Sequence, residues 1–383
     1  MQIRSITVNN FKSLVDFKLD LAKFTCLIGL NGSGKSTVLQ FIDFLSQLMR
    51  GDMKGWLAER KWRSNELKSQ FTKSRKIDFE IEFAKRGKRI ATWQGSYTPA
   101  IGRCLREVIV SERTLLNSSG GFIETYNVKT NCSAKSAVNF DYDGSILSAL
   151  KETLLHPTVV EVKRFLLSSE SLDTLTPDQL RQRTKAANGS LGHGGKNLAA
   201  FLNELYILKR VDLIKKLKAI YPRLRLVTTR SSRGGLKQLI VTEDYAKTRL
   251  RTHARHLNDG MLRILAIFAE MSSDHQFLLF DEIENGINPE IVEFVIDALV
   301  EAKQQVLVTT HSPMILNYLN DDVAKPGVMY LYKTPQGHTQ AVPFFEIPSL
   351  AEKLTVMGPG EAFVDTNLTE LADEIDAMPA KEA

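Results

Sequence analysis

Gly29-Leu30-Asn31-Gly32-Ser33-Gly34-Lys35-Ser36-Thr37 is the stretch of sequence that decides the fold. It matches the phosphate-binding pattern G-x-x-x-x-G-K-[ST]. An apolar run, 24–28, precedes it, and a run with helical periodicity, 38–48, follows it. The order of strand, glycine-rich loop and helix predicts an α/β fold whose loop surrounds a polyphosphate. Backbone N–H groups and the positive end of the helix both favour such an anion.

The last residues of this loop have separate expected tasks. Lys35 would reach the β- and γ-phosphates, and the Ser36 hydroxyl would be a ligand of Mg²⁺. The predicted nucleotide contacts in this stretch are Asn31, Gly32, Ser33, Gly34, Lys35, Ser36 and Thr37.

Length and composition leave the partner open. The chain has 383 residues, of which 43% are hydrophobic, so we expect one large α/β unit with insertions or two lobes. The net charge of +6 permits a nucleic-acid partner, but a solvated basic surface explains it equally well. Three cysteines without metal-like spacing suit a reducing cytosol. No apolar run approaches the roughly 18 residues that span a membrane, so we expect a cytoplasmic protein without a membrane partner.

The first 28 residues alternate as short strands do, with a hairpin turn near Asn9-Asn10. Phe11-Lys12-Ser13 follows this turn, where a side chain can lean over a nucleotide. Lys12 and Ser13 are therefore further candidate nucleotide contacts. A lysine at such a place is otherwise a plain surface charge.

A stretch rich in lysine and arginine runs over residues 51–89, with Trp56 and Trp62 among the basic residues. Basic residues beside aromatic ones hold a nucleic-acid backbone and stack bases. A charged helix or edge strand has the same sequence, so both interpretations stay open. Within the stretch, 77–83 alternates strictly and predicts a half-buried strand with 89–93 as its neighbour.

Two later apolar runs end in residues that suit phosphate chemistry. Phe277-Leu278-Leu279-Phe280 is followed by Asp281, expected in the Mg²⁺ shell, and Glu282, expected to polarise the attacking water as general base. A second buried strand, 305–310, ends at His311, which would bond the γ-phosphate.

A further anion-binding end precedes these strands. Leu257-Asn258-Asp259-Gly260 opens a strongly apolar helix, 264–271, and a helix N-terminus attracts anions. A chain that already has one phosphate loop has little use for a second such end. We therefore expect this end to serve the nucleotide of another copy of the chain.

Several segments, in this order, together resemble the SMC/RecF/OLD-like branch of ABC-type ATPases. They are Phe11-Lys12-Ser13, the phosphate loop, Leu257-Asn258-Asp259-Gly260, Asp281-Glu282, Glu284-Asn285-Gly286 and Thr310-His311-Ser312-Pro313. The segments 194–202 and 358–363 also resemble parts of stand-alone bacterial members, many of which serve in phage defence beside a nuclease or other effector. The resemblance is dense over 1–45 and 255–320 and thin between them.

The resemblance implies a P-loop NTPase fold of the ABC-type head, with a mixed sheet plus helices and a largely helical insertion. The expected parts are the first half of the head, 1–94; a mainly helical insertion, 95–222; the second half of the head, 223–345; and a helical tail, 346–383. No long heptad run lies between the halves, so a long coiled coil is not expected.

The same resemblance implies the cofactors ATP and Mg²⁺ and a homodimer or higher homo-oligomer. Two heads would sandwich two ATPs, with Asn258, Asp259 and Gly260 of each copy capping the nucleotide of the other. Asn258 stands where serine is usual; it still donates a hydrogen bond, but hydrolysis can be altered. For the Mg²⁺-sensing glutamine, Gln94 is the candidate.

Two functions follow from the resemblance. One is a switch ATPase that regulates a separate effector protein, a nuclease or toxin, in anti-phage defence. The alternative is a RecF-like DNA-repair ATPase that acts on DNA itself. Because 72 residues follow His311, we do not expect the nuclease domain of OLD proteins in this sequence. A transporter ATPase fits Phe11-Lys12-Ser13 and the insertion badly.

Overall fold

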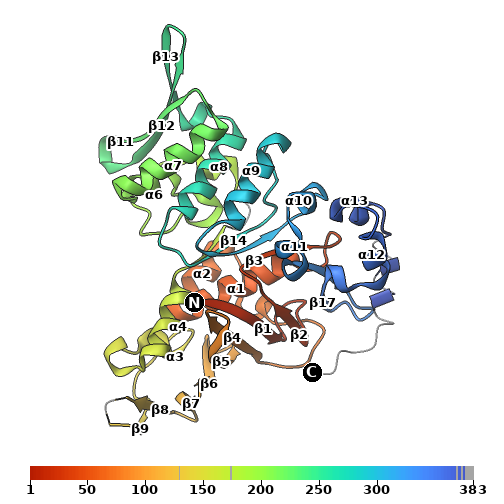
Figure 1. Ribbon diagram of the computed structural model, residues 1–383. Helices are drawn as coiled ribbons and strands as arrows, with labels where there is room; N and C mark the ends of the chain where they lie inside the picture. The colour runs from red at the N-terminus through yellow and green to blue at the C-terminus, as the bar shows by residue number, and fades with distance from the viewer. Residues whose placement is uncertain (129, 173–174, 368–369, 372–373, 376–383) are drawn as a thin grey trace. The chain divides into compact units, whose positions relative to one another are not determined.

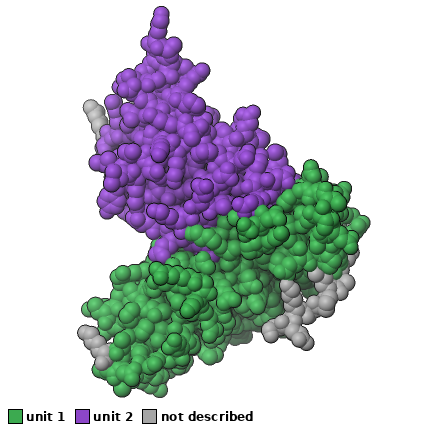
Figure 2. All heavy atoms as spheres, viewed as in Figure 1, with its two compact units in different colours: residues 1–169, 321–383 green, residues 170–320 purple. Residues whose placement is uncertain are grey.

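The computed structural model describes residues 1–128, 130–172, 175–367, 370–371 and 374–375. The chain divides into two compact units, which Figure 2 colours separately. Unit 1 comprises residues 1–169 and 321–383, and unit 2 comprises residues 170–320. These divisions fall at other residues than the domain limits expected from the sequence.

Unit 1 contains most of the strands (Figure 1). Its strands are β1 (Gln2–Asn9), β2 (Phe17–Asp20), β3 (Phe24–Ile28), β4 (Ile77–Lys85), β5 (Lys88–Thr98), β6 (Arg103–Val110), β7 (Thr114–Ser119), β8 (Phe122–Asn127), β9 (Cys132–Ala137), β16 (Val328–Lys333) and β17 (Thr339–Pro343). Its helices are α1 (Lys35–Arg50), α2 (Met53–Arg60), α3 (Ile146–Ala149), α4 (Pro157–Leu167), α11 (Asp321–Gly327), α12 (Pro348–Lys353) and α13 (Pro359–Val364).

An antiparallel sheet in the order β2-β1-β4-β5-β6-β7-β8-β9 forms one layer of unit 1. Its β4 alternates between buried and more exposed residues, as the sequence predicts. The buried side packs on helices: Phe79 lies edge-on to Phe41 of α1, and Phe83 to Phe165 of α4. Because it also packs on its other sides, α1 is buried nearly all round.

The expectation of a mainly helical insertion over 95–222 is wrong for its first part. β6 to β9 continue the antiparallel sheet as far as Ala137, and helices begin only at Ile146. These strands escaped detection because the alternation fades toward the sheet edge. Every residue of β9 is exposed, so neither face has an apolar stripe.

A buried carboxylate joins this sheet to α3. Glu107 of β6 is 1% exposed and accepts hydrogen bonds from the Ser145 hydroxyl at 2.6 Å, the Ile146 amide at 2.7 Å and the Trp93 indole at 3.3 Å. Burial raises the pKa of Glu107 to about 7, although these three donors oppose the shift. The folded protein therefore binds this proton more tightly than the unfolded chain, in which the pKa is near 4.5.

This shift predicts a pH dependence of stability. Glu107 contributes its full share to the free energy of unfolding below its pKa in the unfolded chain. This contribution is lost as the pH rises through the folded pKa of about 7. Relative to Glu107→Gln, the free energy of unfolding should fall by about 3 kcal/mol between about pH 4.5 and pH 7. Chemical denaturation of both proteins across this range measures it, and a constant difference would refute it.

The second sheet segment of unit 1 contains β3, which leads into the phosphate loop. β3 pairs in parallel with β16, Cys26 opposite Val328, and β16 forms an antiparallel hairpin with β17. The N-terminal hairpin of β1 and β2 confirms the sequence prediction. All five residues of β3 are buried, which explains its unbroken apolar pattern.

Trp56 of the basic stretch is packed in the interior of unit 1 and is not open to stacking with bases. Trp56 of α2 is 4% exposed, and its indole donates to Asp43 of α1 at 2.6 Å. Arg60 pairs with the same carboxylate at 2.6 Å, both side chains being 8% exposed. Trp62 lies edge-on to Trp56. The interpretation of Trp56 as a base-stacking residue is therefore wrong.

Removing the Asp43 carboxylate should destabilise unit 1 strongly. Asp43→Ala removes the buried carboxylate that pairs with Arg60 and accepts from the Trp56 indole, which costs about 3–5 kcal/mol. Thermal or chemical denaturation measures the loss. The matched control is Asp141→Ala, whose fully exposed carboxylate lies 3.5 Å from Arg103 and should contribute little. Equal effects of the two substitutions would contradict the expectation.

Unit 2 consists of helices around two parallel strands, with a separate small sheet. After β10 (Ser169–Leu172), its elements are α5 (Pro177–Leu180), α6 (Leu198–Glu204), α7 (Ile207–Ile220), β11 (Leu224–Ser231), β12 (Lys237–Tyr245), β13 (Thr248–His253), α8 (Asp259–Met271), β14 (Phe277–Phe280), α9 (Pro289–Val300), β15 (Gln305–Thr309) and α10 (Met314–Asn317). Strands β11 and β12 form an antiparallel hairpin, and β13 pairs antiparallel with β12.

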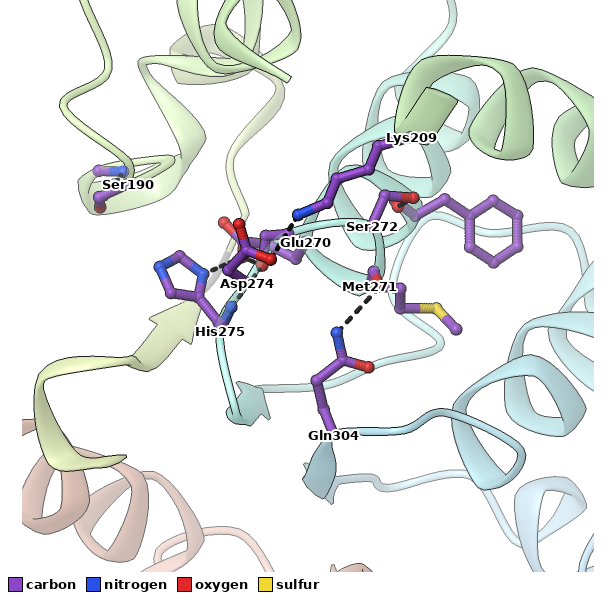
Figure 3. A network of polar contacts seen from close by, with 11 residues as sticks. Ser190, Lys209, Glu270, Met271, Ser272, Asp274, His275 and Gln304 are labelled. Carbon is purple, nitrogen blue, oxygen red and sulfur yellow. Dashed lines mark hydrogen bonds and ion pairs between the residues drawn. The ribbon is translucent and has the colours of Figure 1, made fainter. Parts of the chain in front are cut away.

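A polar network fixes the C-terminal end of α8 (Figure 3). The carboxylate of fully buried Glu270 forms a hydrogen bond of 2.6 Å with Nδ1 of His275. The Gln304 side-chain amide donates to the carbonyl of Met271 at 2.9 Å. Lys209 of α7 pairs with Asp274 at 2.6 Å. With this end held, the opposite end of α8, at Asn258, has a defined position within unit 2.

The helical tail expected over 346–383 is confirmed for α12 and α13, and residues 376–383 lie outside the described part. Within the described residues, no helix combines the length and the apolar character that crossing a membrane requires.

Candidate nucleotide-binding site

The phosphate loop of unit 1 needs its glycines. Gly29 has φ 145°, and a Cβ there would lie 2.2 Å from the carbonyl oxygen of Leu331. Gly34 has φ 111°, and a Cβ there would lie 2.3 Å from the Thr339 hydroxyl. Helix α1 begins directly after Gly34, without a side-chain cap and without an acidic residue in its first turn. Its first N–H groups and positive dipole end thus suit an anion.

The side chains of this loop fit a polyphosphate. Lys35 is 5% exposed, and its ammonium donates to the carbonyls of Gly29 at 2.8 Å and Leu30 at 3.0 Å, inside the curve of the loop. The buried Ser33 hydroxyl has no hydrogen-bond partner among the described residues. Ser36 is exposed and Thr37 is half-buried on the first turn of α1, and Asn31 and Gly32 are exposed.

The β16–β17 hairpin contacts the phosphate loop and holds it by hydrogen bonds. Thr339 is fully buried, and its hydroxyl donates to the carbonyl of Ser33 at 2.8 Å. Lys333 donates to the same hydroxyl at 3.0 Å, and Ser13 lies 2.8 Å from it. The Thr339 hydroxyl thus links Ser13 to Ser33 of the phosphate loop. Burial lowers the pKa of Lys333.

Lys12 is placed beside α1 by contacts of its own. Its ammonium donates to Gln40 at 2.7 Å and lies 3.4 Å from the centre of the Trp62 ring. The preceding Phe11 is fully buried between Phe41 and Phe44. The buried Phe11 side chain therefore fixes this segment, and it thereby positions the adjacent Lys12 and Ser13. A nucleotide contact of Lys12 stays a prediction.

In unit 2, one threonine organises both predicted carboxylates. β14 and β15 are parallel, with Phe280 opposite Val308, so their ends lie side by side. Buried Thr309 donates its hydroxyl to Asp281 at 2.6 Å and accepts from the backbone N–H of Glu282 at 2.9 Å. Glu282 has φ 46°, a conformation that costs about 1–3 kcal/mol in a residue other than glycine.

The predicted His311 lies at the end of the neighbouring strand in the same unit. Its backbone N–H donates to Glu284 at 2.9 Å, and its side chain is exposed. Asn285 donates to Glu282 at 3.1 Å. The turn after Asp281 is thus tied both to the general-base candidate and to His311.

The N-terminus of α8 lies against the same turn. Asn258 caps the helix, its side-chain oxygen accepting from Met261 N–H at 2.8 Å, and Asp259 pairs with Arg181 at 2.5 Å. A Cβ on Gly260 would lie 2.8 Å from the carbonyl oxygen of Gly286. Unit 2 therefore brings Asn258, Asp259 and Gly260 to the turn that follows Glu282.

Arg263, on the next turn of α8, was missed by the sequence analysis. Its buried Nε has no hydrogen-bond partner among the described residues. Burial lowers the pKa of Arg263, while Asp259 and Glu282 oppose the shift. Arg263 thus lies in the field of both carboxylates.

Thr309 gives a prediction that separates positioning from binding. Thr309→Val removes the hydrogen bond to the Asp281 carboxylate, worth about 1.5–3 kcal/mol, and the bond from the neutral backbone N–H of Glu282, worth about 0.5–1.5 kcal/mol. We expect kcat for ATP hydrolysis to fall about 10- to 100-fold with little change in KM. Thr309→Ser, which keeps the hydroxyl, should restore activity. Equal rates for valine and serine would refute the role.

A family of known proteins matches most of the chain. The family described as "AAA domain, putative AbiEii toxin, Type IV TA system" matches residues 24–317. The chain belongs to this family. It is an ATPase, in keeping with the AAA domain that this family's description names.

One relative and two solved structures are also similar to this chain. An OLD nuclease of Thermus scotoductus is 33% identical over 81 residues, which are 21% of this chain and only 14% of that nuclease. A crystal structure of an SMC head bound to the C-winged helix domain of ScpA has a TM-score of 0.54 at 14% identity, covering 89% of this ATPase and 97% of that chain.

A second SMC head, from Pyrococcus furiosus, carries an extended coiled coil and is bound to the C-terminal domain of ScpA. It has a TM-score of 0.50 at 13% identity, covering 92% of this ATPase and 99% of that chain. Both likenesses show the fold alone, and they confirm the predicted P-loop α/β class.

Gln94 is not placed as a magnesium sensor in this ATPase. It lies within β5 and donates to Glu80 of β4 at 2.6 Å. Together with strand residues such as Thr7, Asn9 and Ser96, it lines a recess of about 380 Å³ on the antiparallel sheet. Its amide thus serves the cross-strand contacts of this sheet.

Proposed function

We propose that this protein binds and hydrolyses ATP as a homodimer whose nucleotide state controls a separate effector protein. The observation that carries the proposal is the organisation of two half-sites. Unit 1 holds Lys35 inside a glycine loop braced by Thr339, and unit 2 holds Asp281 and Glu282 on Thr309. One half suits phosphate binding and the other suits water activation. The proposal requires both halves to serve the same nucleotide.

The proposed reaction is an in-line attack of water on the γ-phosphorus of ATP. The new P–O bond forms as the bond to the β–γ bridging oxygen breaks, and ADP leaves. Glu282 accepts a proton from the attacking water, and Lys35 neutralises charge on the β- and γ-oxygens. His311 donates a hydrogen bond to the γ-phosphate.

Mg²⁺ fits the donor set that this chain offers. One carboxylate, Asp281, and one hydroxyl, Ser36, together with substrate phosphates, are the hard oxygen ligands that this ion prefers. Bound there, it would supply charge neutralisation on the β- and γ-phosphates. Thr309 would keep the Asp281 carboxylate oriented toward it.

The second copy is expected to complete each nucleotide site. Asn258, Asp259 and Gly260 of one protomer would cap the triphosphate held by its partner. The side-chain oxygen of Asn258 is occupied by its own helix, so the amide nitrogen is the group left to donate to the γ-phosphate. Arg181 neutralises Asp259, which lowers its repulsion of a phosphate.

The family supports a role beside an effector. Its description names a toxin and a toxin–antitoxin system, and the partial relative is a nuclease. We infer that the effector is a nuclease or toxin made as a separate protein and that the switch acts in anti-phage defence. A RecF-like ATPase acting on DNA itself is the alternative, and the basic residues of unit 2 favour retaining it.

Purification of the native complex tests the effector. The full chain, expressed together with its neighbouring genes, should retain a second protein, and the amount retained should differ between samples with and without ATP. Lys35→Ala should abolish this difference. A chain that purifies alone under both conditions, and whose loss leaves phage sensitivity unchanged, would contradict the defence role. DNA binding strengthened by ATP in such a protein would favour the RecF-like alternative.

A further inference from the structure

The positive charge of this chain is concentrated in one segment of unit 2. Residues 223–256, the basic arm, contain two acidic residues, Glu243 and Asp244, and nine basic ones: Arg223, Arg225, Arg230, Arg233, Lys237, Lys247, Arg249, Arg251 and Arg255. The arm alone carries a net charge of +7, whereas the whole chain carries +6. The remainder of the chain is therefore nearly neutral, and the arm holds the whole excess.

The arm is an ordered antiparallel sheet, not a loose tail. Its strands lie in the order β11-β12-β13. Leu239 and Val241 of β12 and Val227 of β11 are buried on the face that packs against α6 and α7, and Thr229 bonds Asn203 of α6 at 2.9 Å. In Figure 1 the hairpin of β12 and β13 projects beyond the helices of unit 2.

Arginines gather on the opposite face of this sheet. The register pairs Arg251 with Thr242, Arg249 with Asp244 and Arg230 with Gln238, which lie on the face of β12 opposite Leu239 and Val241. The three arginines are exposed, as is Lys247 in the turn at the end of the hairpin.

Internal ion pairs account for only part of this charge. Asp244 pairs with Arg225 at 3.0 Å and Arg249 at 3.2 Å. Across the described part of the chain, no acidic side chain forms an ion pair with Arg230, Lys247 or Arg251. A sheet that holds several exposed, unneutralised cations at fixed spacing suits a polyanion whose charges are also regularly spaced.

We propose that the basic arm binds double-stranded DNA, with the β12–β13 hairpin entering the major groove. The major groove of B-form DNA is about 12 Å wide and admits a two-stranded antiparallel ribbon. Arginine, which supplies seven of the nine basic residues, bonds phosphates and guanine edges in a bidentate way. The deep, narrow major groove of A-form RNA does not admit such a ribbon. This binding is independent of the proposed ATP-driven switch.

A second basic region, in unit 1, is the alternative DNA-binding surface within the same chain. In residues 54–76 of unit 1, Trp56 is buried and Arg60 neutralises Asp43, so part of that region serves the core. Lys54, Lys73 and Lys76 remain exposed there. Replacing these three lysines removes the same charge as replacing three residues of the arm, which makes the two variants a matched pair.

The experiment measures fluorescence anisotropy of a labelled DNA duplex of about 20 base pairs at several salt concentrations. The full chain is compared with the arm variant, Arg230→Gln/Lys247→Gln/Arg251→Gln, and with the control variant, Lys54→Gln/Lys73→Gln/Lys76→Gln. At about 0.1 M salt the arm variant should bind at least about tenfold more weakly. The slope of log affinity against log salt should flatten by about two to three units.

Circular dichroism and basal ATP hydrolysis should be unchanged in both variants, because none of the six residues belongs to the predicted nucleotide site. Duplex RNA and polyglutamate, as probes of equal length, should bind more weakly than duplex DNA. The proposal is overturned if the control variant loses more affinity than the arm variant. It is also overturned if polyglutamate or duplex RNA binds as tightly as DNA, or if the full chain binds no DNA while it still hydrolyses ATP.

Discussion

Replacing Glu282 by glutamine is expected to stop ATP turnover and to leave a stable ATP-bound dimer. Glutamine has the shape of glutamate and accepts the same bond from Asn285, but it cannot take the proton of the attacking water. We expect kcat to fall by about 100-fold or more, because general bases contribute about that much. Phosphate release measures the rate, and light scattering with ATP and Mg²⁺ measures the mass.

The control for this substitution is Glu290→Gln, an exposed carboxylate in the first turn of α9, which should behave like the unchanged protein. Adding Lys35→Ala to Glu282→Gln should abolish the dimer, since no nucleotide would then be held. If Glu282→Gln hydrolyses ATP at the normal rate and remains monomeric with ATP, Glu282 is not the general base.

Lys35→Ala should remove nucleotide binding. The ammonium lies inside the phosphate loop, and losing a charge-assisted contact of this kind costs about 1.5–3 kcal/mol, or about 100-fold in affinity at the upper end. Titration with a fluorescent ATP analogue measures this loss. Lys54→Ala, an exposed lysine of α2, is the matched control. Unchanged affinity of Lys35→Ala would show that the loop does not hold the nucleotide.

Much of the fold follows from strong local patterns in the sequence. The buried strands β3, β14 and β15 are short apolar runs, and β4 alternates cleanly, so each is recognisable without tertiary information. The glycine pattern predicts a phosphate loop, and in the structure a Cβ at Gly29 or Gly34 would lie within 2.3 Å of a neighbouring oxygen. Such signals depend on neighbouring residues only.

The elements that were missed depend on distant partners. β9 has no apolar side, and β13 is recognisable only through its pairing with β12. Trp56 looks like an exposed aromatic residue until Asp43, on another helix, is seen to bond it. Composition cannot distinguish such a buried cluster from a nucleic-acid surface.

The supporting residues of the candidate site are the hardest to predict. Thr309 and Thr339 are ordinary strand threonines in the sequence, and their roles arise because each strand end lies beside a functional loop. Arg263 likewise gains its position from the turn at Gly286. The motif residues themselves were predictable because phosphate chemistry restricts them to few residue types.

The central claim is that each nucleotide site combines Lys35 and Glu282 of one protomer with Asn258 of its partner. Asn258→Asp keeps the helix cap but places a carboxylate where the amide would meet the γ-phosphate, so it should be inactive. Mixing it with inactive Lys35→Ala leaves one intact site in each mixed dimer. The mixture should therefore recover about a quarter of the normal rate of ATP hydrolysis.

Mixing Lys35→Ala with Glu282→Gln is the matched control, since each mixed dimer then has a defect in both sites and should stay inactive. The rate of phosphate release in these two mixtures is the most direct measurement of the claim. Recovery in the first mixture alone is the result that the composite site predicts. No recovery in the first mixture, or equal recovery in both, would contradict it.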